Sequence, residues 1–184
     1  MSTPLTHRRS LRALAHASIE HGLRHYEPVG VSLQAWPERL RQPCSTFVTL
    51  CLGDQLRGCV GALESARPLA RDVAVNAFAA AFRDPRFTPV TAIEFPDIEL
   101  HVSLLSPIEP LEARSEADLI RQLRPGVDGL IFEEGDRCGT FLPVVWRSLP
   151  SAGDFLAQLK AKTGLPPDYW SETLRAYRYT TEEF

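Results

Sequence analysis

The chain contains, between residues 45 and 61, the stretch STFVTLCLGDQLRGCVG. β-Branched and apolar residues dominate on both sides of Gly53-Asp54, a pair that suits a two-residue hairpin turn. The stretch therefore predicts one strand, a tight turn and a second strand, and it forms the expected centre of a sheet.

The register of this hairpin decides which side chains share a face. With the turn at residues 53 and 54, Cys51 pairs with Leu56 and Cys59 pairs with Val48. Arg57 and Cys59 then lie on one face, and Cys51 lies on the other. A disulfide between the two cysteines is disfavoured by this geometry.

Helical patterns flank the hairpin on both sides. Apolar residues recur at helical spacing between positions 11 and 19, and Gly22 is expected to end that helix. Pro68 suits the first turn of a second helix, whose run Ala79-Ala80-Ala81 predicts close packing against a neighbour.

The remaining patterns alternate between strands and helices. Residues 98–104 alternate apolar and polar side chains, the period of a half-buried strand, and place His101 on its more polar face. Ser115 and Ser151 each precede a predicted helix. A second hairpin is predicted between residues 131 and 142, and a last strand near residues 176–180.

Composition excludes several classes of protein. The chain has 184 residues, a hydrophobic content of 44% and a formal net charge of -3, which fits a folded core and argues against a general nucleic-acid binder. It has no signal-like start and no apolar run of membrane-spanning length, so a cytoplasmic location is expected.

The four cysteines show no metal-binding spacing. Cys44, Cys51, Cys59 and Cys138 form no C-x-x-C pair, so no metal site is predicted, and free thiols are expected in a reducing compartment. The sequence also lacks the motifs of an iron-sulfur cluster or a dinucleotide loop, and no cofactor is predicted.

Five motifs in order along nearly the whole chain resemble the AMMECR domain family, whose bacterial members are called protein A of the AmmeMemoRadiSam system. The motifs are Leu56-Arg57-Gly58-Cys59-Val60-Gly61, Asp84-Pro85-Arg86-Phe87, Val102-Ser103-Leu104-Leu105-Ser106-Pro107, Phe141-Leu142-Pro143 and Lys162-Thr163-Gly164-Leu165.

The resemblance implies an α+β fold with two subdomains and a cleft between them. The larger subdomain, an antiparallel sheet with flanking helices, is expected to hold both termini in residues 1–63 and 98–184. The smaller, mainly helical subdomain is expected at residues 64–97. The resemblance also implies a pathway shared with Memo-like and radical S-adenosylmethionine proteins, and the sequence permits a homodimer.

Two functional hypotheses centre on Arg57-Gly58-Cys59. In the first, the protein is a non-catalytic binding module, in which cationic side chains hold a small anion or a peptide. In the second, Cys59 is a nucleophile, Arg57 stabilises its thiolate and His101 is the candidate base. The candidate ligand-binding residues are Arg57, Gly58, Gly61, Arg83, Asp84 and Arg86.

Two further interpretations stay open. Aromatic side chains beside arginines could stack on RNA bases, against which the acidic net charge argues. These aromatic residues are Phe87, Trp146, Tyr169, Trp170, Tyr177 and Tyr179. Alternatively, Gly58 and Gly61 serve close packing, Cys59 is a small buried hydrophobic residue, and Arg57 pairs with Asp84 or Glu64.

Overall fold

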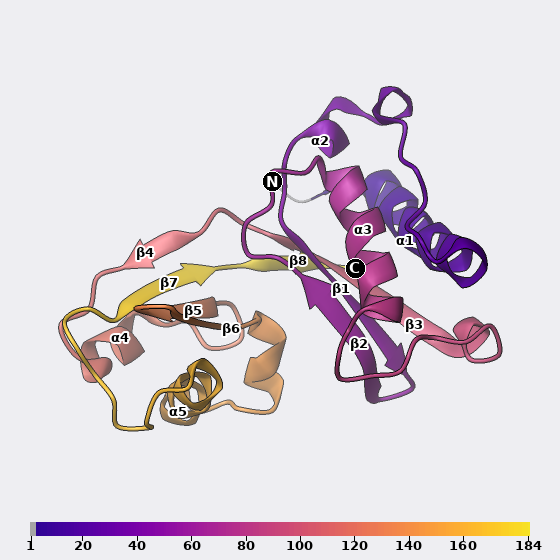
Figure 1. The fold of residues 1–184 in the computed structure, drawn as a ribbon. Helices are drawn as coiled ribbons and strands as arrows, with labels where there is room; N and C mark the ends of the chain where they lie inside the picture. Colours follow the sequence, from indigo (N-terminus) through magenta and orange to yellow (C-terminus); the bar gives the residue numbers. More distant parts are fainter. Residues whose placement is uncertain (1–2) are drawn as a thin grey trace. The chain divides into compact units, whose positions relative to one another are not determined.

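The structure, a computed structural model, describes residues 3–184, and Figure 1 traces the chain. The chain divides into two units. Unit 1 runs to Leu105 and takes in Glu182–Phe184, and unit 2 comprises Ser106–Thr181. Each unit combines a four-stranded sheet with helices, which confirms the predicted α+β fold.

Unit 1 is built around a sheet of order β2-β1-β3-β8. Its strands are β1 (Thr46–Leu52), β2 (Gln55–Gly61), β3 (Ile98–Leu105) and β8 (Thr181–Glu183). Its helices are α1 (Leu5–His25), α2 (Glu38–Arg41) and α3 (Leu69–Phe82), with short 3-10 turns at Leu33–Ala35 and Phe95–Asp97.

One face of this sheet is covered by α1 and α3 (Figure 1). Val48, Leu50 and Val102 point to that face and are fully buried, as is Val73 of α3. The other face alternates with it and carries Thr49, Cys51, Cys59, Glu99 and His101. We call this second face the polar face.

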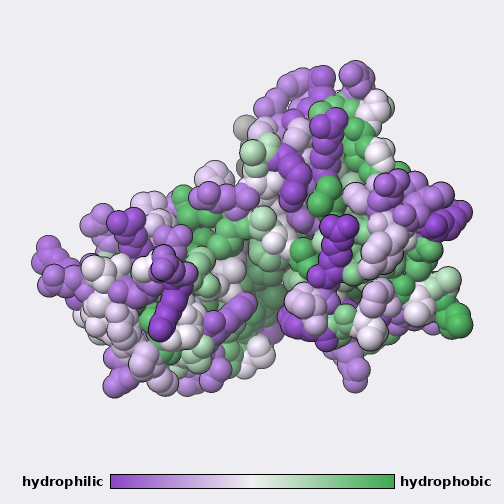
Figure 2. All heavy atoms as spheres, viewed as in Figure 1, coloured by the Kyte–Doolittle hydropathy of each residue, from purple (hydrophilic) through white to green (hydrophobic). Residues whose placement is uncertain are grey.

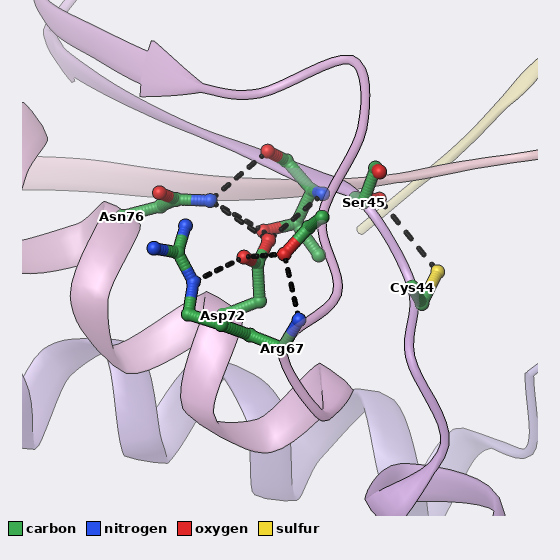
Figure 3. Close-up of polar contacts among 7 residues, drawn as sticks. Cys44, Ser45, Arg67, Asp72 and Asn76 are labelled. Carbon is green, nitrogen blue, oxygen red and sulfur yellow. Dashed lines mark hydrogen bonds and ion pairs between the residues drawn. The ribbon is translucent and has the colours of Figure 1, made fainter.

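A buried carboxylate fixes the start of β1 to α3 (Figure 3). Asp72 accepts hydrogen bonds from the Thr46 amide (3.0 Å), the Thr46 hydroxyl (2.7 Å) and the Asn76 amide group (2.9 Å). Its other oxygen accepts from Ser65 (2.6 Å) and Arg67 Nε (2.8 Å). Every lone-pair direction of the carboxylate is therefore used, which offsets the cost of burying a charge.

Unit 2 has a sheet of order β4-β7-β5-β6. Its strands are β4 (Glu109–Leu111), β5 (Gly129–Glu134), β6 (Arg137–Phe141) and β7 (Arg175–Tyr179). Its helices are α4 (Glu116–Gln122) and α5 (Ala152–Thr163), with a 3-10 turn at Pro143–Arg147. Ser115 and Ser151 cap the two helices as predicted, each accepting from the amide three residues on.

One expectation about the first helix differs from the structure. Gly22 does not end α1, which continues to His25, because Gly22 is buried and a Cβ there would lie 2.4 Å from Phe82 Cε2. The missing side chain therefore serves helix packing. Residues 64–97 lie within unit 1, where α3 packs on α1, β1 and β2, and the unit boundaries fall at residues 105–106 and 181–182.

Among the helices of residues 3–184, none has both the length and the apolar character that crossing a membrane requires.

Candidate functional site

A one-residue bulge in the first hairpin sets the position of Cys59. The turn at Gly53-Asp54 and the pairing of Cys51 with Leu56 are as predicted, but Leu50 then pairs with Gly58. Arg57 is the extra residue. Cys59 consequently pairs with Thr49 instead of Val48 and lies on the same face as Cys51.

The bulge brings three polar side chains into one row across the polar face. Thr49 pairs with Cys59 on one side and with His101 on the other, and all three are half-buried. The Thr49 hydroxyl donates a hydrogen bond to Cys59 Sγ at 3.3 Å. Because neighbouring strands lie about 4.8 Å apart, the backbones of Cys59 and His101 are about 10 Å apart.

Asp84, after α3, holds the backbone of Cys59 from the edge of β2. Its Oδ2 accepts the Cys59 amide at 2.9 Å, and its two oxygens accept Arg86 Nε at 2.9 Å and Nη2 at 2.7 Å. Arg86 also donates to the Cys59 carbonyl at 3.2 Å. The hydrogen bonds from Arg86, followed by that from the Cys59 amide, lower the pKa of Asp84 to about 2.

Arg57 pairs with a different carboxylate from either of those expected. Its Nε and Nη2 contact Glu94 at 3.1 and 2.8 Å, and Nη2 also donates to the Thr88 carbonyl at 2.9 Å. The bond from Arg57 holds the pKa of Glu94 below its usual value. Arg57 Nη1 is buried and has no hydrogen-bond partner among residues 3–184.

Two of the three candidate ligand-binding arginines have their charge compensated by a carboxylate. Arg57 and Arg86 each have a carboxylate partner, and both guanidinium groups lie near the Phe87 ring, at 5.9 and 5.4 Å from its centroid. Arg83 is placed differently, because its guanidinium lies 5.1 Å from the Phe78 ring centroid. The structure thus brings Arg57 and Arg86 to one ring and leaves Arg83 at the end of α3.

The two glycines of the motif lie at points of close packing. A Cβ on Gly58 would lie 2.2 Å from the Ala80 carbonyl oxygen, and one on Gly61 would lie 2.4 Å from the Phe47 ring. The predicted close approach of the alanine run in α3 is therefore made by Ala80 against β2. At these two positions glycine is required by packing.

The other three cysteines have thiols whose pKa values are raised. Desolvation is the main cause that raises the pKa of Cys44, Cys51 and Cys138, and Glu99 raises that of Cys51 further. All four cysteines are present as thiols. Cys59 Sγ accepts a hydrogen bond from the Thr49 hydroxyl.

The aromatic residues considered for RNA stacking include two that are buried in unit 2. Trp146 is 4% exposed and stacks on Phe155 at 3.9 Å between ring centroids, and Tyr179 is 1% exposed. These two rings support the core, so they offer no exposed face to a base. Within residues 3–184, no three His, Cys, Asp or Glu side chains come together as a metal site.

Sequence reasoning missed Thr49 and Glu94 as parts of this site. A hydroxyl in the middle of an otherwise apolar strand is a signal that marks Thr49 as a candidate site residue. The pairing of Thr49 with Cys59, however, depends on the bulge. Glu94 is 37 residues from Arg57 along the chain, and no local pattern joins them.

Comparison with known proteins gives one consistent result. The AMMECR1 family profile matches residues 12–184. The chain is 40% identical over 182 residues to a protein of Methanothermobacter thermautotrophicus, covering 96% of this chain and 92% of that one. It is 35% identical to Protein MJ0810 of Methanocaldococcus jannaschii, covering 84% and 79%.

A solved structure has the same fold. The uncharacterized protein PH0010 from Pyrococcus horikoshii matches with a TM-score of 0.89 and 33% identity, over 96% of this chain and 89% of that one.

Proposed function

The chain belongs to the AMMECR1 family, and we propose that it is a thiol-dependent enzyme in which Cys59 is the nucleophile. The observation that carries the proposal is the hydrogen bond of 3.3 Å from the Thr49 hydroxyl to Cys59 Sγ, within a row that ends at His101. A thiolate is the reactive form of cysteine, and a donor aimed at the sulfur stabilises it.

Arg86 supports the same charge state. Its guanidinium is held beside Cys59 by Asp84 and by the Cys59 carbonyl. Asp84 is the main cause that raises the pKa of Arg86, and negative charge at Cys59 contributes as well. The Arg86 cation thus lies against the backbone of Cys59, with Nη2 at 3.2 Å from the carbonyl oxygen.

In this proposal His101 transfers protons to and from the substrate rather than to and from Cys59. Two strand spacings separate it from Cys59, so a substrate that reaches both side chains would lie over Thr49. The sulfur attacks an electrophilic carbonyl carbon, and the departing group takes a proton from the imidazolium of His101. Water then releases the acyl group from Cys59, with neutral His101 taking the proton from that water.

Alkylation with iodoacetamide, followed by mass spectrometry of each cysteine peptide, tests the proposal. Cys59 is expected to react faster at pH 7 than Cys51 or Cys138, whose pKa values are raised. Thr49→Val should slow the reaction of Cys59 about fivefold, the effect of losing about 1 kcal/mol.

Two controls separate this mechanism from a general effect on the fold. Cys51→Ser changes a thiol on the same face and should leave the rate at Cys59 unchanged. His101→Gln should change that rate less than twofold, because His101 lies two strands away. Alkylation of Cys59 no faster than that of exposed Cys138 would contradict the proposal.

A binding module is the second candidate, and the buried Nη1 of Arg57 favours it. This nitrogen has an unused N–H donor near the Phe87 ring, and it could donate a hydrogen bond to one carboxylate oxygen of a small anion or peptide. Memo-like and radical S-adenosylmethionine proteins are the first partners to test by pull-down. Recovery that survives Cys59→Ser but fails with Arg57→Lys would favour binding over catalysis.

A further inference from the structure

A pocket of about 440 Å³ lies in unit 1, on the α3 side of the sheet. One wall is the chain at residues 28–31, which joins α1 to α2 in Figure 1, and the other is the first half of α3 with the residue before it. The lining comprises Pro28, Val29, Gly30, Val31, Arg67, Arg71, Ala74 and Val75. This volume falls within the range of small-molecule sites.

A buried hydroxyl ties the two walls together. Ser18 of α1 is fully buried, and its Oγ donates to the Ala74 carbonyl at 2.7 Å. The same oxygen accepts the Val29 amide at 3.2 Å. This hydroxyl therefore holds the Val29 amide close to α3 and positions one wall of the pocket.

Two arginines give the pocket a positive end. Arg67 is oriented by the bond from its Nε to the buried Asp72, and both of its terminal nitrogens point away from that carboxylate in Figure 3. Arg71 has no carboxylate partner among residues 3–184. The lining contains two arginines and no acidic residue.

The rest of the lining is apolar. The side chains of Val29, Val31, Ala74 and Val75 supply hydrocarbon walls, while strongly hydrophilic residues lie over α3 in Figure 2. A bare inorganic anion would gain nothing from the valines, and a cation would be repelled by the arginines. A ligand that satisfies both parts is a carboxylate with a short hydrocarbon group.

We propose that this pocket binds a small carboxylate carrying an aliphatic chain, with the carboxylate on Arg67 and Arg71 and the chain against the valines. The acid can be free or can be the C-terminus of a peptide that ends in an aliphatic residue. The site is separate from Cys59, which lies on the polar face, so neither proposal depends on the other.

NMR titration of the ¹⁵N-labelled full chain tests the proposal with hexanoate as the probe. Saturable shifts are expected in the amides of residues 29–31 and 71–75. Acetate, which lacks the chain, and hexanamide, which lacks the charge, should each bind at least about tenfold more weakly. Equal binding of hexanoate and hexanamide would overturn the role of the arginines.

Matched variants locate the site. Arg71→Gln should weaken hexanoate about tenfold, and Arg71→Lys should restore part of the affinity. Arg83→Gln makes the same charge change outside the pocket and should have no effect. Tighter binding of N-acetyl-alanyl-leucine than of hexanoate would identify a peptide C-terminus as the source, and the reverse a free acid. Absence of saturable shifts with both probes overturns the proposal.

Discussion

Replacing Asp84 by asparagine removes the carboxylate that joins Arg86 to the backbone of Cys59 while keeping the size of the side chain. Asp84 is 3% exposed in its side chain, and it accepts from the Cys59 amide and from two nitrogens of Arg86. Asparagine retains one oxygen and places an NH₂ group where the second oxygen accepts. The ion pair is therefore lost, and one donor faces another donor.

The magnitude follows from the pKa of Asp84, which is lowered from 3.8 to about 2 in the folded protein. A shift of this size corresponds to about 2 kcal/mol of folding free energy. Because the folded pKa lies below the unfolded value, this stabilisation is fully present above pH 3.8 and is lost as the pH falls through about 2. Asp84→Asn should lower the free energy of unfolding by about 2 kcal/mol at pH 7 and by progressively less below pH 4.

Urea unfolding followed by circular dichroism between pH 2 and pH 7 measures this difference. Asp54→Asn makes the same chemical change in the exposed turn of the first hairpin and should match the parent protein within about 0.5 kcal/mol. A constant deficit for Asp84→Asn across the whole pH range would refute the ion-pair argument. Equal stability of the variant and parent at pH 7 would refute it as well.

Two more predictions concern packing and a buried charge. Gly58→Ala places a Cβ 2.2 Å from the Ala80 carbonyl oxygen and should destabilise the protein by about 2 kcal/mol in urea unfolding, whereas Gly30→Ala, with no atom within 4 Å, should change stability by less than about 1 kcal/mol. In unit 2 the fully buried Lys160 ammonium contacts Glu116 at 2.6 Å, so Glu116→Gln should lower the free energy of unfolding by about 1 to 3 kcal/mol, and an unchanged melting temperature would contradict this.

Much of the fold follows from local sequence signals. The Gly53-Asp54 turn is real, with Gly53 at a φ of +55°, a value that favours glycine. Ser115 and Ser151 begin their helices because their hydroxyl oxygens accept amides three residues on. These features depend on neighbours in the chain, and for that reason a single sequence is enough to predict them.

Features that depend on contacts between residues far apart along the chain cannot be predicted from local sequence patterns. Glycine commonly ends a helix, yet Gly22 lies inside α1. Phe78 and Phe82 of α3 occupy the space that a side chain at this position would need. The sequence predicts Asp84 or Glu64 as the partner of Arg57. In the structure, the loop after α3 brings Glu94 to Arg57 instead. Each outcome is decided by tertiary packing over tens of residues.

The bulge at Arg57 places each residue of Arg57-Gly58-Cys59 in different surroundings. In a regular hairpin Cys59 would pair with Val48 and face α3, where the sheet is fully buried. The extra residue turns Arg57 toward Glu94 and puts Gly58 under Ala80, where a side chain does not fit. Cys59 is thereby moved to the polar face beside Thr49, with Asp84 holding its amide. Packing explains both glycines of the motif, and an ion pair explains Arg57. Neither packing nor an ion pair accounts for the thiol of Cys59 on the polar face. Cys59 is therefore the residue of the motif at which chemistry should be tested.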